Sequence, residues 1–186
     1  MALTATIHNF DIDLADSDRG VYETLALRVA RHPSESEEYL VARVLAYCLE
    51  YGEGIGFSSG ISDPDDPTIA IRDLTGVIRT WIDIGTPEGD RLHKAGKVAR
   101  RVVVYCHKDP TQWLRQLAGA RMHRADALEL YGFESSFIKT IATKLARRMA
   151  FALTVSDRQL LIALDDGVIE GSVTTLRPLE PDTARS

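Results

Sequence analysis

The chain has 186 residues and a mass of 20.6 kDa, enough for one ordinary domain or at most two very small ones. Hydrophobic residues make up 45% of the sequence and the mean hydropathy is −0.10, which excludes a disordered chain. No apolar run approaches the roughly 18 residues that span a bilayer, and the first residues lack a signal-peptide pattern. Both cysteines, Cys48 and Cys106, lie in apolar segments and are predicted to be buried free thiols. We therefore expect a cytoplasmic protein without membrane contacts.

The net charge of −5 is distributed unevenly along the chain. Residues 1–90 contain 6 Lys and Arg against 17 Asp and Glu, a balance of −11, whereas residues 91–150 contain 13 against 4, a balance of +9. Residues 151–186 contain 3 against 6, a balance of −3. This division is compatible with a carboxylate site that faces a phosphate-binding surface, although charges that merely cover solvated helix faces are the alternative.

The first third of the chain predicts strands followed by a helix. Alternating apolar and polar residues predict an antiparallel strand pair over residues 4–30. Ser34 and Glu37 form a capping-box pattern, and helical spacing continues from there to near Gly52. A loop rich in Gly, Ser, Asp and Pro follows over residues 52–67, and such a long break is a place to look for function.

The middle of the chain predicts a hairpin, a helix and a parallel strand. Residues 68–72 and 77–84 are rich in β-formers and are joined by a turn that begins at Asp73 and ends at Gly76. A helix is expected from Pro87 to about residue 100. The apolar run at residues 102–106 then predicts a central strand buried on both faces, because a strand, helix and strand in succession form a crossover.

The remaining residues predict two further helices and a C-terminal meander. Helices are expected over residues 110–117 and 135–146, with a short strand between them at 127–131. Strands are expected at residues 151–155, 160–164 and 168–175. The sequence thus predicts a single α/β domain over residues 1–186, with a mixed β-sheet flanked by helices and a flexible tail at 178–186.

Several common catalytic motifs are excluded. Residues 56–60 match G-x-S-x-G, but a helix precedes them and two prolines follow, so the strand–serine–helix arrangement of a nucleophile elbow is absent. The sequence contains no Walker A lysine motif and no G-x-G-x-x-G after a strand. The five histidines show no metal-ligand spacing with one another or with the cysteines.

The remaining candidate site is a group of carboxylates around the hairpin. Asp83 lies within an apolar strand, where a charge is costly unless it is paired or bound to a metal. If Asp73 opposes Val77 across the turn, Asp83 faces residue 67 and its neighbours, and Asp65 and Asp66 lie close to it. Turn geometry alone accounts for Asp73.

Basic residues follow the hairpin on the next predicted helix. Lys94, Lys97 and Arg101 recur every three to four residues, so one helix face is expected to concentrate their charge, with Arg91 one turn earlier. On the first helix, Glu37 is accounted for by the cap, whereas Glu38 is available for other contacts.

Four motifs resemble the signature of the YaeQ family, a group of bacterial proteins. They are Arg31-His32-Pro33-Ser34-Glu35, Asp73-Leu74-Thr75-Gly76, Trp81-Ile82-Asp83-Ile84-Gly85-Thr86-Pro87 and Arg91-Leu92-His93-Lys94-Ala95. The resemblance extends over essentially the whole chain. It implies a fold similar to a variant of the restriction-endonuclease-like PD-(D/E)XK core, and it implies no established biochemical activity.

The likeness to PD-(D/E)XK enzymes implies roles for individual residues. In those enzymes one acid precedes a hairpin and a second acid closes it, two positions before a lysine, and the acids hold Mg²⁺. Asp65 or Asp66 corresponds to the first acid, with Asp73 a further alternative, and Asp83 corresponds to the second. Gly85 occupies the position of the lysine.

Two further residues complete the site that the resemblance implies. Lys94 on the next helix could supply the missing positive charge by migration, and Glu38 could supply an acid from the first helix. Asp83, Lys94 and Glu38 are therefore the expected catalytic residues. The expected metal ligands for Mg²⁺ are Asp65, Asp66 and Asp83, and the expected substrate-binding residues are Arg91, Lys97 and Arg101.

The resulting hypothesis is a nuclease-like protein with a degenerate PD-(D/E)XK site that hydrolyses phosphodiester bonds of nucleic acid with Mg²⁺. The alternative is a non-catalytic factor that binds nucleic acid, or a protein of transcription or repair, with the same scaffold. A metabolic enzyme of another chemistry is the third hypothesis.

Overall fold

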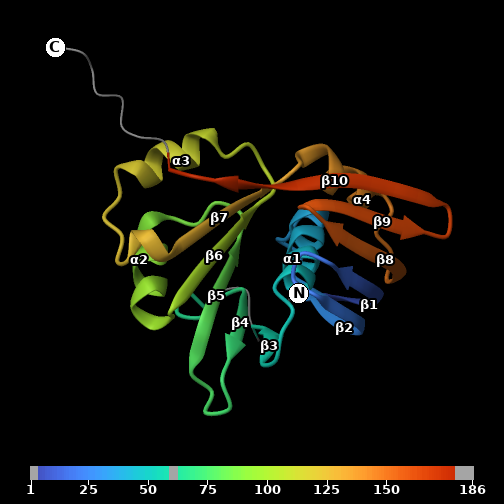
Figure 1. Ribbon diagram of the computed structural model, residues 1–186, viewed down its shortest axis with the longest axis horizontal. Helices are drawn as coiled ribbons and strands as arrows, with labels where there is room; N and C mark the ends of the chain where they lie inside the picture. The colour runs from blue at the N-terminus through green and yellow to red at the C-terminus, as the bar shows by residue number, and fades with distance from the viewer. Residues whose placement is uncertain (1–3, 59–62, 179–186) are drawn as a thin grey trace. The chain divides into compact units, whose positions relative to one another are not determined.

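The computed structural model describes residues 4–58 and 63–178, and their contacts divide them into two compact units (Figure 1). Unit 1 contains residues 4–51 and 133–174. Unit 2 contains residues 52–58, 63–132 and 175–178. The prediction of one domain over residues 1–186 stays a prediction, and most of the expected tail lies outside the described residues.

Unit 1 is built on a mixed sheet with the strand order β2-β1-β8-β9-β10. Its strands are β1 (Thr6–Asp16), β2 (Val21–Arg31), β8 (Arg148–Ser156), β9 (Gln159–Leu164) and β10 (Gly167–Leu176). β1 runs antiparallel to β2 and parallel to β8, and β8, β9 and β10 form an antiparallel meander. In β1 the alternate residues Phe10, Ile12 and Leu14 are buried, as the sequence pattern predicts. The predicted strand pair and meander are confirmed.

Two helices, α1 (Glu37–Leu49) and α4 (Ser135–Thr143), contact each other in unit 1. The predicted cap of α1 is wrong, because Ser36 and not Ser34 precedes the first helical turn. The Ser36 hydroxyl accepts a hydrogen bond from the backbone N–H of Tyr39 at 3.0 Å. The Ser34 hydroxyl lies instead 2.6 Å from Nδ1 of His32. Because the Ser34 side chain contacts His32, it does not cap the helix, and Ser36 takes that role although Ser34 and Glu37 match the capping-box pattern.

The strands of unit 2 follow the order β7-β6-β5-β4-β3 within the same ten-stranded sheet order and include both parallel and antiparallel pairs. Its strands are β3 (Ile55–Phe57), β4 (Ile69–Arg72), β5 (Ile78–Ile84), β6 (Arg101–Cys106) and β7 (Leu128–Phe133). β3, β4 and β5 are antiparallel, whereas β5, β6 and β7 are parallel. β6 pairs on both sides and its residues 102–106 are buried, so the predicted central strand is confirmed. The sequence reasoning missed β3, whose three residues lie within the expected loop.

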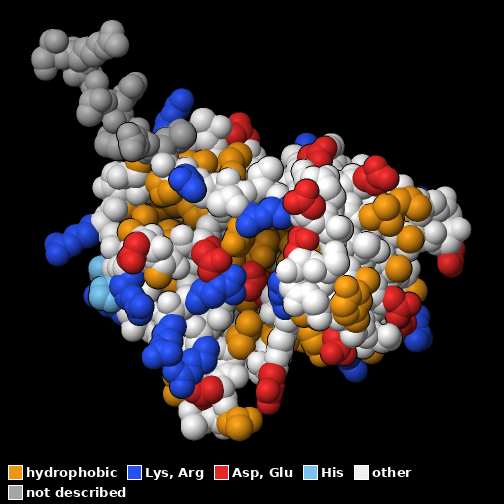
Figure 2. All heavy atoms as spheres, viewed as in Figure 1, with side chains coloured by type: hydrophobic (Ala, Val, Ile, Leu, Met, Phe, Trp, Pro, Cys, Tyr) orange, Lys and Arg blue, Asp and Glu red, His pale blue; other side chains and the backbone are white. Residues whose placement is uncertain are grey.

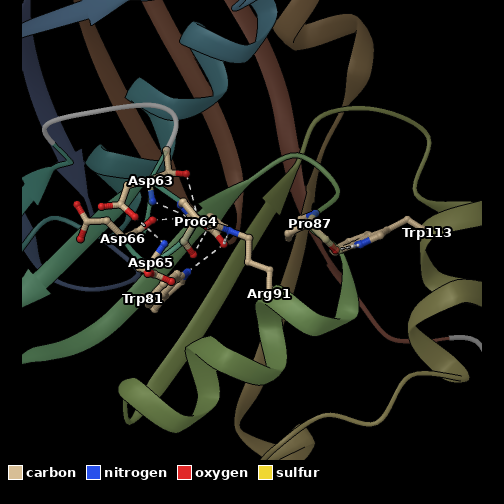
Figure 3. Close-up of polar contacts among 10 residues, drawn as sticks. Asp63, Pro64, Asp65, Asp66, Trp81, Pro87, Arg91 and Trp113 are labelled. Atoms are coloured by element: carbon tan, nitrogen blue, oxygen red, sulfur yellow. Dashed lines mark hydrogen bonds and ion pairs between the residues drawn. The ribbon is translucent and has the colours of Figure 1, made fainter.

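Two helices of unit 2, α2 (Gly89–Val98) and α3 (Thr111–Ala118), share one hydrophobic core with its strands. The short 3₁₀ helix η1 (Ala125–Ala127) has no buried residue. Leu92 of α2 and Leu117 of α3 pack in the same cluster as Trp81 of β5. The indole N–H of Trp113 also donates a hydrogen bond to the carbonyl oxygen of Pro87 at 2.7 Å (Figure 3). This packing fixes the helix that carries most of the candidate basic residues.

Together these elements confirm the predicted α/β class with a mixed β-sheet and flanking helices. Cys48 and Cys106 are free and buried, and burial raises the pKa of the Cys48 thiol to about 12. No helix within residues 4–58 and 63–178 is long and apolar enough to cross a membrane.

Candidate functional site

Asp83, near the end of β5, is the most deeply buried acid of unit 2, with 2% of its surface exposed. Three side chains and one backbone amide donate hydrogen bonds to its carboxylate. Oδ1 accepts from the amide and the hydroxyl of Thr68, both at 3.2 Å. Oδ2 accepts from the indole N–H of Trp81 at 2.9 Å. Arg91 donates to both oxygens, from Nε to Oδ2 at 2.7 Å and from Nη2 to Oδ1 at 2.9 Å. The carboxylate is thus both neutralised and saturated with donors.

The strand register explains how Asp83 meets Thr68. Within the hairpin Ile69 pairs with Ile82, which places residue 68 opposite Asp83. The turn begins as predicted, because the Asp73 amide donates to the Val77 carbonyl at 3.0 Å. A shift in register between residues 71 and 72 then changes the residue opposite Asp83 from the expected residue 67 to residue 68.

Arg91 connects Asp83 to the loop that precedes β4 (Figure 3). Its guanidinium donates to the carbonyl oxygen of Pro64 at 3.1 Å and to that of Asp66 at 2.9 Å. The guanidinium carbon also lies 5.3 Å from the centre of the Trp81 ring, a favourable cation–π distance. A single side chain of α2 therefore binds the end of β5 and the loop around residues 64–66.

The two predicted first acids have separate basic partners. Asp65 forms an ion pair with Lys94, and both side chains are largely exposed. Asp66 accepts a hydrogen bond from Nη2 of Arg72 at 3.0 Å. These contacts bring Asp65, Asp66, Asp83 and Lys94 into one region of unit 2. Figure 3 shows Arg91 beside Asp65 and Asp66.

Asp73 has the structural role that its sequence context predicts. Its carboxylate accepts hydrogen bonds from the hydroxyl and amide of Thr75, from the amide of Val77 and from Arg79. The Thr75 hydroxyl is the largest cause that lowers the pKa of Asp73, to about 2. These contacts close the hairpin turn at the end opposite Asp83.

The predicted Mg²⁺ ligands already pair with basic side chains. Such an ion needs near-octahedral oxygen ligands at about 2.0–2.1 Å. Arg91, a permanent cation, already donates to both oxygens of Asp83, and Asp65 is paired with Lys94. Within the described residues no three His, Cys, Asp or Glu side chains are grouped so that they could hold a metal ion. A Mg²⁺ ion at these residues would have to displace Arg91 and Lys94, and the site stays a prediction.

A surface of exposed cations surrounds α2, and it differs in part from the predicted one. Arg101 does not extend the helix face, because α2 ends at Val98 and Arg101 begins β6. There Arg101 pairs with Glu129 of β7, with Nη2 and Oε1 3.1 Å apart. Lys97 remains exposed on α2. Figure 2 shows Lys and Arg side chains gathered over the region of α2, with histidine beside them.

The segment after α3 lies directly against α2. A Cβ atom built on Gly96 would lie 2.5 Å from the carbonyl oxygen of His123, and one built on Gly89 would lie 2.7 Å from Cβ of Ala120. The rings of His93 and His123 meet edge to face with 6.2 Å between their centres. These close approaches bring the basic residues of positions 121–124 beside those of α2.

Glu38, the third predicted catalytic residue, lies in the first turn of α1 and belongs to unit 1. The other predicted site residues belong to unit 2. A role for Glu38 in the same site stays a prediction. The buried acid near the start of α1 is Glu35, whose Oε2 lies 3.2 Å from Nη2 of Arg43.

Sequence reasoning missed two residues that contact Asp83. Trp81 precedes Asp83 by two positions, and residues two apart on a strand point to the same face. That spacing could have identified the indole as a neighbour of the carboxylate. Thr68 required the correct register across the hairpin, which depends on the irregularity after Ile71.

Fold and site together define an α/β protein with mixed sheets, a buried and neutralised acid, and an exposed cationic surface. A sequence model described as YaeQ protein matches residues 1–173, so the chain belongs to the YaeQ family. It is 27% identical over 176 residues to the uncharacterized protein YaeQ of Escherichia coli (strain K12), which covers 94% of this chain and 97% of that protein. The YaeQ protein of Salmonella typhi is 36% identical over 107 residues, covering 58% of this chain and 59% of that protein.

Two solved structures share the fold. The crystal structure of the YaeQ protein from Xanthomonas axonopodis pv. citri has a TM-score of 0.86 and 30% sequence identity, covering 95% of this chain and all of that one. The YaeQ protein from Pseudomonas syringae has a TM-score of 0.84 and 27% identity, covering 92% of this chain and 96% of that one.

Proposed function

We propose that the protein binds nucleic acid through phosphate contacts made by the exposed cations around α2, and that it does so without hydrolysing the bound strand. The observation that carries this proposal is a set of exposed Lys and Arg side chains that form no ion pair within the described part of the chain. These residues, called the cationic surface below, are Lys97, Arg100, Lys108, Arg115, Arg121 and Arg124.

The local charge supports this proposal. Residues 91–124 contain nine Lys and Arg and one Asp, a balance of +8 in a chain whose net charge is −5. An acidic protein attracts a polyanion only through such a local concentration of positive charge. Exposed cations without counter-ions are available for phosphate oxygens, and each phosphate neutralised releases condensed counter-ions.

The surroundings of Asp83 favour binding over hydrolysis. A carboxylate that is to bind a catalytic ion or activate water needs lone pairs directed at the reacting groups. The oxygens of Asp83 instead accept hydrogen bonds from Arg91, Trp81 and Thr68. Lys94, the expected catalytic lysine, is held by Asp65.

Fluorescence anisotropy with labelled single- and double-stranded DNA and RNA tests the proposal. A threefold alanine variant of the cationic surface is compared with a matched variant that removes three exposed cations of unit 1. The first variant is Lys97→Ala, Arg121→Ala and Arg124→Ala, and the control is Arg28→Ala, Lys139→Ala and Arg147→Ala. Both change the net charge by the same amount.

Binding by the wild type is expected to weaken steeply with salt. Loss of three phosphate contacts should reduce the magnitude of the slope of log K against log salt by about 2–3. It should also reduce the affinity at low salt at least tenfold, to about the same extent for every nucleic-acid sequence. The control variant should bind like the wild type. Equal loss in both variants would refute a specific surface. No affinity of the wild type at about 0.15 M salt would refute nucleic-acid binding and favour a protein partner of transcription or repair.

Mg²⁺-dependent phosphodiester hydrolysis is the second candidate function. The gathering of Asp65, Asp66 and Asp83 near Lys94 favours it, because acids and a lysine in one place match the PD-(D/E)XK pattern. Incubation of the same nucleic acids with Mg²⁺ or Mn²⁺ separates the two candidates. Cleavage products that disappear in Lys94→Ala, which changes an exposed side chain, would establish hydrolysis and overturn the binding-only proposal.

A further inference from the structure

We infer that Arg91 is a built-in cation that occupies a divalent-cation position in unit 2, and that removal of its side chain opens a metal site. The basis is the set of oxygens around its guanidinium (Figure 3). Two carboxylate oxygens of Asp83 and the carbonyl oxygens of Pro64 and Asp66 all lie 2.7–3.1 Å from its nitrogens.

Those four oxygens have the chemistry of a hard-cation site. Carboxylates combined with backbone carbonyls are the ligands that Ca²⁺, Mg²⁺ and Mn²⁺ prefer. They come from two separate segments, the end of β5 and the loop before β4, and they surround one guanidinium. A cation is needed there, because the carboxylate of Asp83 is buried and both carbonyl oxygens present partial negative charge to the same guanidinium.

The guanidinium meets that need in a way that excludes a metal. Its charge is delocalised over a planar group whose donors reach all four oxygens at once. The ring of Trp81 faces the guanidinium while its indole N–H binds Asp83, so one residue positions both partners. A divalent ion within reach of the same oxygens would be repelled by the guanidinium at close range.

Two variants separate the charge of Arg91 from its shape. Arg91→Ala leaves Asp83 and the two carbonyl oxygens without their cation, and we expect Mn²⁺ to bind there at least tenfold more tightly than to the wild type. Arg91→Lys keeps a positive charge at the end of a flexible stem, and we expect it to exclude Mn²⁺ as the wild type does. Addition of Asp83→Asn to Arg91→Ala should abolish the acquired binding.

Mn²⁺ titration of ¹⁵N-labelled protein without nucleic acid gives a local readout that is independent of the proposed function. Paramagnetic broadening should affect the amide signals of Asp66, Thr68 and Asp83 selectively in Arg91→Ala, and not in the wild type or Arg91→Lys. Selective broadening of these signals in the wild type at submillimolar Mn²⁺ would overturn the inference, whether or not the variants fold.

The alanine variant is decisive only if it folds. A folded Arg91→Ala that shows no selective broadening would refute the presence of a cation site among these oxygens. If Arg91→Ala unfolds, Arg91→Gln takes its place, because glutamine keeps a donor for Asp83 while removing the charge. Unchanged spectra of a folded Arg91→Gln with millimolar Mn²⁺ would then refute the inference in the same way.

Discussion

Replacement of Asp83 by Asn is expected to destabilise unit 2 strongly, although the two side chains have nearly the same shape. Asparagine has one accepting oxygen and one donating NH₂ group. In either orientation the NH₂ group faces donors, which are Trp81 and Arg91 at the Oδ2 position or Thr68 and Arg91 at the Oδ1 position. At least two of the five accepted hydrogen bonds are therefore lost, and Arg91 loses its counter-ion.

The magnitude follows from burial. Loss of one partner of a buried ion pair costs about 3–5 kcal/mol. Arg91 keeps 27% of its side chain exposed, so water compensates part of the loss and the expected decrease in the free energy of unfolding is about 3 kcal/mol. For a chain of this size that decrease lowers Tm by roughly 6–12 °C.

Tryptophan fluorescence during urea unfolding is a suitable assay, because Trp81 and Trp113 are the only tryptophans and both lie in unit 2. Asp126→Asn is the matched control, since it makes the same chemical change at an exposed position of unit 2. A decrease below about 1 kcal/mol for Asp83→Asn, or an equal effect of both variants, would refute the reasoning.

Three further predictions concern both units. Glu35→Ala should lower the free energy of unfolding by about 3–5 kcal/mol, because it leaves the buried Arg43 without its carboxylate, and Arg43→Met in the same chain should restore part of the loss in urea titrations. The lowered pKa of Asp73, caused first by the Thr75 hydroxyl, means that its carboxylate stabilises the fold above about pH 4 and that this contribution is lost as the pH falls toward about 2. Unfolding midpoints measured across that range should fall less steeply in Asp73→Asn than in the wild type. Gly171→Ala should cost about 1–3 kcal/mol in thermal unfolding, because its Cβ would lie 2.2 Å from an aromatic ring of α4, and an unchanged Tm would contradict the tight packing.

The sequence by itself determined the elements whose patterns are local. The hairpin turn at Asp73, the buried strand β6 and the meander β8–β10 follow from turn chemistry and from the two-residue period of strands, which act over a few neighbouring residues. Local patterns predicted less reliably where two neighbouring residues could fill the same role. The cap of α1 lies at Ser36 although Ser34 fits the capping box better, because only the folded chain shows which serine faces the first turn.

The sequence also identified Asp83 as an unusual acid, since a charge within an apolar strand needs a partner. It could not identify that partner. Arg91 and Lys94 lie one helical turn apart and both reach the end of β5 or the loop before β4, so spacing alone does not distinguish them. Only the tertiary structure decided that Arg91 binds Asp83 while Lys94 binds Asp65. The planar guanidinium satisfies four oxygens from two segments at once, and those segments come together only when the chain folds.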